Sequence, residues 1–319
     1  MKTTEIQLRA LAPAKVNLVL RVGPLRADGY HDLDTLMVPL DLSDEIEVRV
    51  VRGRRGKVIC RTPGRPELDG PGNLAAKAAE AFRRRLGVED RVELEVVKRI
   101  PVTAGLGGGS SDAAAVLRAL ARAYGVRDRE ALASAALEVG SDVPFFLGSG
   151  PAWAAGRGER LAPARVPTQH LVLAYPLDKA LAIRAGDAYR WLDEARGETR
   201  PGAQGYSPFP ARRWRPGLAQ NDLQGPCFER HPSLGSLARA LVGEGATTAI
   251  MSGSGPTVFG VFPDRAAARR AAGAMGKGGR ERSIEVHVVR SLQRHPGVSG
   301  WKSPRSASSP SLKRSSGHT

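Results

Sequence analysis

A glycine-rich stretch in the middle of the chain has the residue types and spacing of a phosphate-binding loop. Its glycines stand at positions 105, 107, 108 and 109, and Ser110, Ser111 and Asp112 follow them. Glycines let backbone N–H groups approach an anion, and the N-terminus of a following helix adds free donors and a partial positive charge. The two serine hydroxyls add contacts to a phosphate or to a metal. The stretch therefore predicts a site for a phosphorylated ligand.

Two common nucleotide-binding patterns do not fit this stretch. It is not a Walker A loop, because no Gly-Lys-Ser/Thr occurs at the required spacing. It is not a dinucleotide fingerprint either, because Ser110 stands at the position of the third glycine. A flexible strand-to-helix connection is the remaining alternative, and the Ser-Ser-Asp-Ala-Ala run after the glycines argues against it.

A lysine and an asparagine near the N-terminus are a second candidate group. Apolar residues alternate along residues 16–22, which predicts a strand with one buried face. Lys15 and Asn17 fall together on the other face. An amine and an amide are therefore expected to project side by side.

The elements that position these residues follow from periodicity and capping signals. Residues 92–97 alternate enough to predict a strand, and Ser110 or Ser111 is expected to cap a helix over 113–124. Further strands are expected at 5–11, 16–22, 33–38, 45–51, 171–175 and 283–289, with a hairpin over 247–262. Further helices are expected at 74–86, capped by Asn73, at 128–139, capped by Asp128, and at 185–194 and 264–275.

Length and composition predict a two-domain protein of the cytosol. The 319 residues suffice for two domains, which we place at residues 1–165 and 166–292, followed by a disordered basic tail at 293–319. No 18-residue apolar run and no apolar signal-peptide core occur, so no membrane span or secretion is expected. Cys60 and Cys227 lie far apart in the sequence, which favours reduced structural thiols.

The net charge of +16 favours anionic ligands. Phosphorylated substrates fit this charge, and so would nucleic acid. No segment has the pattern of a nucleic-acid-binding module, so a non-enzymatic nucleic-acid binder is the weaker alternative.

Three segments taken in order resemble the motifs of the GHMP small-molecule kinases, the superfamily of galactokinase and of homoserine, mevalonate and phosphomevalonate kinases. The segments are residues 12–18, 101–112 and 251–257, and the resemblance covers roughly residues 8–292. It implies an α+β protein of two domains. The first would be an α/β domain with a left-handed βαβ element, and the second a smaller ferredoxin-like α+β domain.

Two further segments narrow the resemblance within that superfamily. Residues 26–31, Arg-Ala-Asp-Gly-Tyr-His, and residues 140–145, Gly-Ser-Asp-Val-Pro-Phe, are similar to the branch whose acceptor is a cytidine diphosphate-linked methylerythritol. The resemblance implies transfer of the γ-phosphoryl group of ATP to the 2-hydroxyl of that acceptor, in the non-mevalonate route to isoprenoid precursors. A GHMP kinase with another acceptor, such as homoserine or a mevalonate derivative, is the alternative, and the Asp-Gly-Tyr-His run argues against it.

The resemblance also implies roles for single residues. Lys15 and Asp142 match the catalytic pair. This fits the chemistry, because an attacking hydroxyl must lose its proton to a base such as a carboxylate. A nearby ammonium group keeps that carboxylate ionised and stabilises developing charge.

The remaining implied contacts are with the two substrates. Tyr30 and His31 match a cytosine-binding pair, Tyr189 a second aromatic on the other face of the base, and Asn17 a further substrate contact. The nucleotide contacts implied are Asn73, Lys98, Pro101, Val102, Thr103, Ala104, Gly105, Leu106, Gly107, Gly108, Gly109, Ser110 and Ser111. ATP implies a divalent ion, most simply Mg²⁺, which Ser110 or Ser111 could ligate. No further metal ligand and no oligomeric state follow from the sequence.

Overall fold

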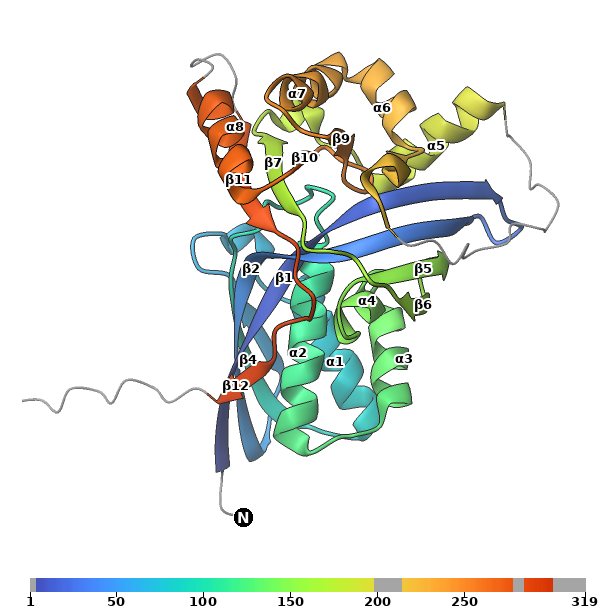
Figure 1. Ribbon diagram of the computed structural model, residues 1–319. Helices are drawn as coiled ribbons and strands as arrows, with labels where there is room; N and C mark the ends of the chain where they lie inside the picture. Colours follow the sequence, from blue (N-terminus) through green and yellow to red (C-terminus); the bar gives the residue numbers. More distant parts are fainter. Residues whose placement is uncertain (1–3, 198–213, 278–283, 301–319) are drawn as a thin grey trace, which may run out of the picture.

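The computed structural model describes residues 4–197, 214–277 and 284–300, which form two sheets with helices packed on them (Figure 1). The elements of the first part of the chain are β1 (Thr4–Leu25), β2 (His31–Arg55), β3 (Val58–Arg61), α1 (Leu74–Leu86), β4 (Asp90–Val97), α2 (Gly108–Tyr124), α3 (Arg129–Val139), α4 (Val143–Leu147), β5 (Ala152–Gly156) and β6 (Arg160–Pro163). Those of the second part are β7 (His170–Pro176), α5 (Ala185–Arg196), β8 (Gln220–Asn221), α6 (Gln224–Arg230), α7 (Pro232–Gly243), β9 (Thr248–Met251), β10 (Val258–Phe262), α8 (Arg265–Lys277), β11 (Ile284–Arg290) and β12 (Val298–Gly300).

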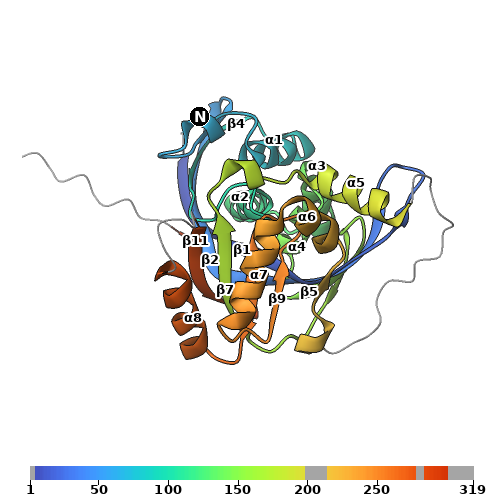
Figure 2. The same ribbon diagram turned by 90° about the horizontal axis from the view of Figure 1, so that it is seen from above.

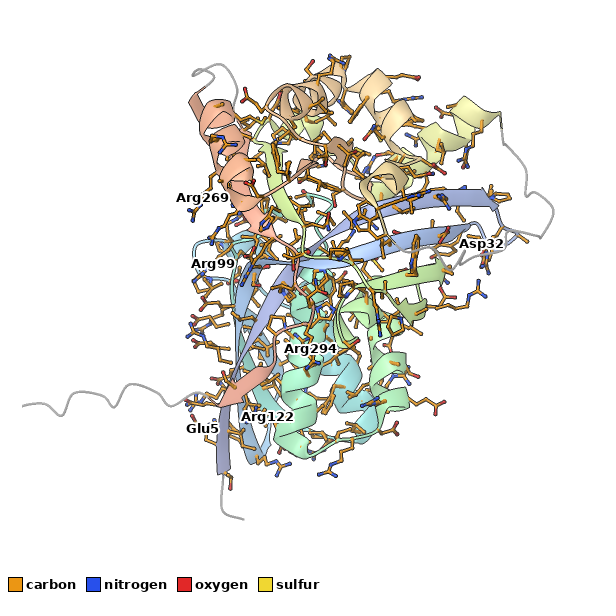
Figure 3. The ribbon with its side chains drawn as sticks, in the orientation of Figure 1. Glu5, Asp32, Arg99, Arg122, Arg269 and Arg294 are labelled. Atoms are coloured by element: carbon orange, nitrogen blue, oxygen red, sulfur yellow. The ribbon has the colours of Figure 1, made fainter. Side chains whose placement is uncertain are left out.

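The N-terminal sheet has the strand order β12-β1-β2-β4-β3, and β5, β6 and β8 join it at its sides. Strands β3 and β4 are parallel and are connected through α1, which is the place of the βαβ element expected from the resemblance. Helices α1 and α2 bury their small apolar faces against the sheet, with Phe82 among the largest fully buried side chains. On the outer side, charged residues such as Glu5 and Arg99 project into solvent (Figure 3). One face of this sheet is therefore buried under helices, and the other is charged and exposed to solvent.

The C-terminal sheet is antiparallel and has the order β11-β7-β10-β9. Counted along the domain, these are the fourth, first, third and second strands, which is the order of a ferredoxin-like fold. Helices α7 and α8 pack on the strands of this sheet, as the view from above shows (Figure 2). The expected α+β fold of two such domains is confirmed.

The hairpin of β1 and β2 belongs to both domains. The open end of the hairpin pairs with β4 through β2 in the N-terminal sheet. The end that carries the turn extends beneath α5 and α6 (Figure 1). There Leu20 and Val22 join the core of the C-terminal domain. The prediction of four short strands in this region was wrong, because β-bulges such as the one between Pro13 and Lys15 bend the strands without ending them.

The start of α2 also differs from the sequence prediction. The helix begins at Gly108, with Gly107 as its N-cap at φ 69°, so neither Ser110 nor Ser111 caps it. Both serines lie inside the first turns instead. Asn73 and Asp128 do cap α1 and α3 through their side chains, as the sequence predicts.

The prediction of a disordered tail from residue 293 was wrong for residues 293–300. Residues 293–300 pack on the N-terminal domain, where β12 pairs antiparallel with β1 between Leu8 and Ala10. The short Val-Ser-Gly run has too few apolar residues to predict a strand, and pairing with an existing edge supplies its stability. Residues 301–319 lie outside the described part of the chain. Within the described part, no helix is long and apolar enough to span a membrane.

Asn221 connects the N-terminal sheet to the hairpin of β9 and β10. Its amide Nδ2 donates to the carbonyl oxygens of Met251 (2.7 Å) and Gly253 (2.8 Å), and its Oδ1 accepts from the backbone N of Leu223 (3.0 Å). The side chain is only 8% exposed. Water therefore cannot easily replace these three hydrogen bonds.

We expect Asn221→Ala to lower the free energy of unfolding by about 2–3 kcal/mol, because buried polar groups lose their partners. Denaturant unfolding followed by circular dichroism measures this change. Gln220→Ala is the matched control, since that side chain makes one weaker hydrogen bond to Asp222 at 3.2 Å. Equal stability of the two variants would contradict the role given to Asn221.

Candidate active site

The glycine-rich loop lies between the two domains and contacts the hairpin of β9 and β10. The hydroxyl of Ser252 donates to the carbonyl oxygen of Gly105 at 3.0 Å. Gly105 has φ 74°, and a Cβ at this position would stand 2.2 Å from the carbonyl oxygen of Ser252. Only glycine therefore allows the loop to approach the hairpin this closely.

One face of the loop lines a cavity of about 500 Å³. The lining includes the first turn of α2, Asn73 at the N-cap of α1, and the side chain of Lys98. Every residue predicted to contact the nucleotide lines this cavity except Ser111, which is fully buried. The free N–H groups at the start of α2 make this cavity suited to an anion.

Lys98 is held in this cavity wall by two carboxylates. Its ammonium group donates to Asp112 Oδ2 at 2.7 Å and also to Asp44, and all three side chains are at most 8% exposed. Burial alone would lower the pKa of Lys98, but the charges of Asp112 and Asp44 outweigh it and raise that pKa. Lys98 is therefore a fixed cation beside the start of α2.

Asp112 accepts fewer hydrogen bonds than Asp44. Asp44 also accepts the backbone N–H groups of Arg99 and Ile100, whereas Oδ1 of Asp112 has no hydrogen-bond partner within the described residues. Burial raises the pKa of Asp112, and the charge of Asp44 adds to this effect against that of Lys98. Two buried carboxylates around one ammonium thus make Asp112 easier to protonate than an exposed aspartate.

The other face of the loop lines a second cavity of about 570 Å³, and Gly105 and Gly107 line both cavities. Every residue predicted for catalysis or for the second substrate lines this cavity: Lys15, Asn17, Tyr30, His31, Asp142 and Tyr189. These residues come from β1, the turn before β2, the start of β2, α5 and the N-cap of α4. The fold thus brings together six residues that span most of the sequence.

Lys15 and Asp142 meet where the two cavities adjoin. Lys15 Nζ lies 3.5 Å from Asp142 Oδ2 and donates to Asn17 Oδ1 at 2.7 Å. The Lys15 side chain is 5% exposed and that of Asp142 is 37% exposed. Asp142 makes no capping hydrogen bond to α4, so its carboxylate remains available to a ligand.

Asn17 is itself held by a relay of hydrogen bonds. Its Nδ2 donates to Thr35 Oγ1 at 2.8 Å, and the Thr35 hydroxyl donates to the carbonyl oxygen of Val19 at 2.7 Å. This relay fixes which end of the Asn17 amide faces Lys15. Lys15 and Asn17 therefore project side by side from β1, as the alternation of residues 16–22 predicts.

His31 and Tyr189 form a stacked pair in the wall of this cavity. Their rings lie 5.3 Å apart at 17° to one another, and His31 Nε2 is 2.9 Å from Asp193 Oδ1. Burial and, second, the negative charge of Asp142 raise the pKa of Tyr189, so its hydroxyl stays protonated. Both residues line the cavity, with one ring stacked on the other.

Tyr30 carries a cation over its aromatic ring. Its ring is 49% exposed and is covered by the guanidinium of Arg157, which lies 3.6 Å from the ring centre. Arg157 lines the cavity from the turn between β5 and β6. It places a cation on the aromatic face, where a base would otherwise stack.

Sequence reasoning missed the residues that support the site from other elements. Arg157, Asp193 and Thr35 each contact a predicted site residue, yet none belongs to a recognisable motif. A signal existed only for Arg157, which stands between Gly156 and Gly158 in a tight turn. The other two are ordinary helix and strand residues whose role depends on tertiary contacts.

A phosphate-binding loop between two substrate-sized cavities, with a lysine–aspartate pair at their junction, defines a small-molecule kinase. Two family models match the chain: the GHMP kinases N terminal domain at residues 73–150, and the GHMP kinases C terminal at residues 212–281.

Similar proteins identify the branch. The chain is 67% identical over 316 residues to a 4-diphosphocytidyl-2-C-methyl-D-erythritol kinase of Anaeromyxobacter dehalogenans strain 2CP-C, which covers 98% of this chain and 99% of the relative. It is 42% identical to the enzyme of that name from Deinococcus radiodurans, over 83% of this chain and 88% of the relative. A crystal structure of 4-(cytidine 5'-diphospho)-2C-methyl-D-erythritol kinase matches with a TM-score of 0.67 and 34% identity, over 89% of this chain and 99% of that one. The chain belongs to the 4-diphosphocytidyl-2-C-methyl-D-erythritol kinase family of GHMP kinases.

We expect Gly107→Ala to reduce turnover about tenfold or more, because small displacements of reacting groups are costly. Gly107 has φ 69°, and a Cβ there would stand 3.0 Å from Lys15 Cγ and 3.1 Å from Phe146 Cζ. Steady-state kinetics of ADP release measure the effect. Gly72→Ala is the control, since Gly72 lines the nucleotide-side cavity but has no atom within 4 Å of an added Cβ. Parental turnover in a folded Gly107→Ala protein would contradict this reading.

Proposed function

We propose that this protein transfers the γ-phosphoryl group of ATP to the 2-hydroxyl of 4-diphosphocytidyl-2-C-methyl-D-erythritol. The observation that carries the proposal is the junction of the two cavities at Lys15 and Asp142, with Gly105 and Gly107 as the shared wall. The names of the similar proteins support the same reaction. We also propose that it acts in the cytoplasm, as a step in the supply of isoprenoid precursors.

In this proposal ATP occupies the cavity at the start of α2. The backbone N–H groups of the glycine loop and the helix dipole bind its phosphates, and Lys98 and Asn73 lie where the base or ribose would be held. The cation of Lys98 is fixed by Asp44 and Asp112, so it requires little reorganisation when the nucleotide binds.

We propose Mg²⁺ as the ion that accompanies ATP. The described residues contain no group of three or more His, Cys, Asp or Glu side chains placed to hold a metal. Ser110 lines the nucleotide cavity, and a hydroxyl with phosphate oxygens and waters is a donor set that suits Mg²⁺. When bound, the ion would neutralise charge on the phosphates, while Ser111 is too buried to reach it.

The chemical step that we propose is direct transfer. The acceptor oxygen forms a bond to the γ-phosphorus, the bond from that phosphorus to the bridging oxygen breaks, and ADP leaves. Asp142 accepts the proton of the acceptor hydroxyl. The ammonium of Lys15, held by Asn17, keeps Asp142 ionised and stabilises charge that develops on the transferred group.

The cytosine end of the acceptor would lie against His31 and Tyr189. His31 and Tyr189 offer a flat surface, and the contact of His31 with Asp193 fixes the orientation of the imidazole. An imidazole edge and an aromatic face suit a planar base better than homoserine or mevalonate, which have none. This part of the cavity therefore favours the cytidine-bearing acceptor.

We expect Asp142→Asn to lower kcat by roughly 10²–10⁴-fold, because it removes the proton acceptor and its charge while keeping the side-chain size. The KM of the acceptor should change little. A coupled ADP-release assay measures both constants. Asp178→Asn is the matched control, since Asp178 only caps a short surface turn through Ala180. Turnover of Asp142→Asn within threefold of the parent would exclude Asp142 as the base.

We expect His31→Ala to raise the KM of the cytidine-bearing acceptor roughly tenfold or more, because base contacts contribute about 1–3 kcal/mol. The KM of ATP should stay within twofold. His231→Ala serves as the histidine control, because that ring packs beside Trp191 away from the cavity. Normal affinity of His31→Ala for the cytidine-bearing acceptor would favour a different acceptor class.

A further inference from the structure

The last described residues form a strap, residues 291–300, that leaves the C-terminal sheet and crosses the N-terminal domain in front of α2 (Figures 1 and 3). The backbone N of Leu292 donates to the carbonyl oxygen of Pro39 at 2.7 Å, and that of His295 donates to Ser149 at 3.2 Å. The strap ends in β12, which pairs with β1. It is therefore tied to the N-terminal domain along its length.

The chain opposite the strap is shaped to receive it. A Cβ at Gly150 would stand 2.3 Å from the carbonyl oxygen of Gln293, so only glycine permits this approach. The side chain of Gln293 donates to the carbonyl oxygen of Val166 at 3.0 Å, and Arg122 of α2 donates to that of Val298. These contacts hold the strap against the segment after α4, the segment after β6 and helix α2.

His295 is the residue of the strap that reaches α4. Its ring meets Phe145 at 5.1 Å and 82°, and Phe146 at 5.7 Å and 63°, which are edge-to-face contacts. Burial lowers the pKa of His295 to about 4, and the charge of Arg118 adds to this effect against the nearby carbonyl of Phe145. The imidazole is therefore neutral near pH 7 and packs as an aromatic ring.

The two phenylalanines connect this ring to the site. Helix α4 begins directly after Asp142 and has only five residues, too few for a helix to be stable without packing. Phe146 Cζ and Lys15 Cε each stand 3.1 Å from the place of a Cβ on Gly107, so both side chains approach this glycine. Arg118 of α2 donates to the carbonyl oxygen of Phe146 at 2.8 Å. Displacement of α4 would thus move Asp142, and loss of Phe146 would open space beside Gly107, which Lys15 also approaches.

We propose that His295 is a positioning residue for the pair of Lys15 and Asp142, acting through Phe145 and Phe146; this rests on the proposed roles of that pair. The strap extends from the C-terminal sheet to α4, so this helix is held by His295 of the strap and by Arg118 of α2. His295 itself touches no substrate cavity. Its effect is on the rate of the chemical step and not on binding.

Steady-state kinetics of His295 variants test the proposal. We expect His295→Ala to lower kcat about tenfold, with the KM values of ATP and of the acceptor within twofold of the parent. His295→Phe, which keeps a ring edge against Phe145 and Phe146, should restore kcat to within about threefold. Gln293→Ala is the control on the same strap, because it removes one strap contact without touching α4, and it should turn over as the parent does.

Three kinetic results would contradict the positioning role of His295. Parental kcat in His295→Ala, an equal loss of kcat in Gln293→Ala, or no rescue by a folded His295→Phe would overturn the proposal. If thermal melting shows that His295→Ala does not fold, His295→Leu keeps most of the volume but no ring edge, and should still lose kcat about tenfold. These comparisons are made with whichever acceptor the parent phosphorylates, so they stay separate from the proposed acceptor. If the proposed acceptor is wrong, the parent enzyme does not phosphorylate the cytidine-bearing compound.

Discussion

The close approach of Gly105 to the carbonyl oxygen of Ser252 is the contact on which the site depends. It brings the loop at the start of α2 against the hairpin of the C-terminal domain, so that one layer of backbone separates two cavities. A side chain at Gly105 or Gly107 would push the domains apart or displace Lys15. Transfer between two bound substrates requires a thin partition, and glycine backbone is the thinnest that a protein can build.

The charges around this partition are arranged so that each buried cation has fixed partners. Lys15 is held by Asn17 and faces Asp142, while Lys98 is held by two carboxylates on the nucleotide side. Charges that are already oriented need little reorganisation when the γ-phosphoryl group moves between them. The mainly basic surface adds attraction for two anionic substrates.

The sequence predicted the parts of the site that rest on local chemistry. The glycine loop, the lysine and amide on one strand face, and the caps at Asn73 and Asp128 all follow from short-range patterns. The long β1–β2 hairpin, the strap at residues 291–300 and the cover of Arg157 over Tyr30 do not, because bulges and packing between distant segments determine them. Tertiary contacts override local signals in each of these places.

The central claim is that this site transfers the γ-phosphoryl group of ATP to a cytidine-bearing alcohol. Phosphorus NMR of a reaction with ATP and equal amounts of 4-diphosphocytidyl-2-C-methyl-D-erythritol, mevalonate and homoserine tests it most directly. The account predicts one ADP for each new phosphate monoester, formed on the 2-hydroxyl of the cytidine-bearing compound alone. Release of ADP without that monoester, or phosphorylation of another acceptor at a comparable rate, would contradict it.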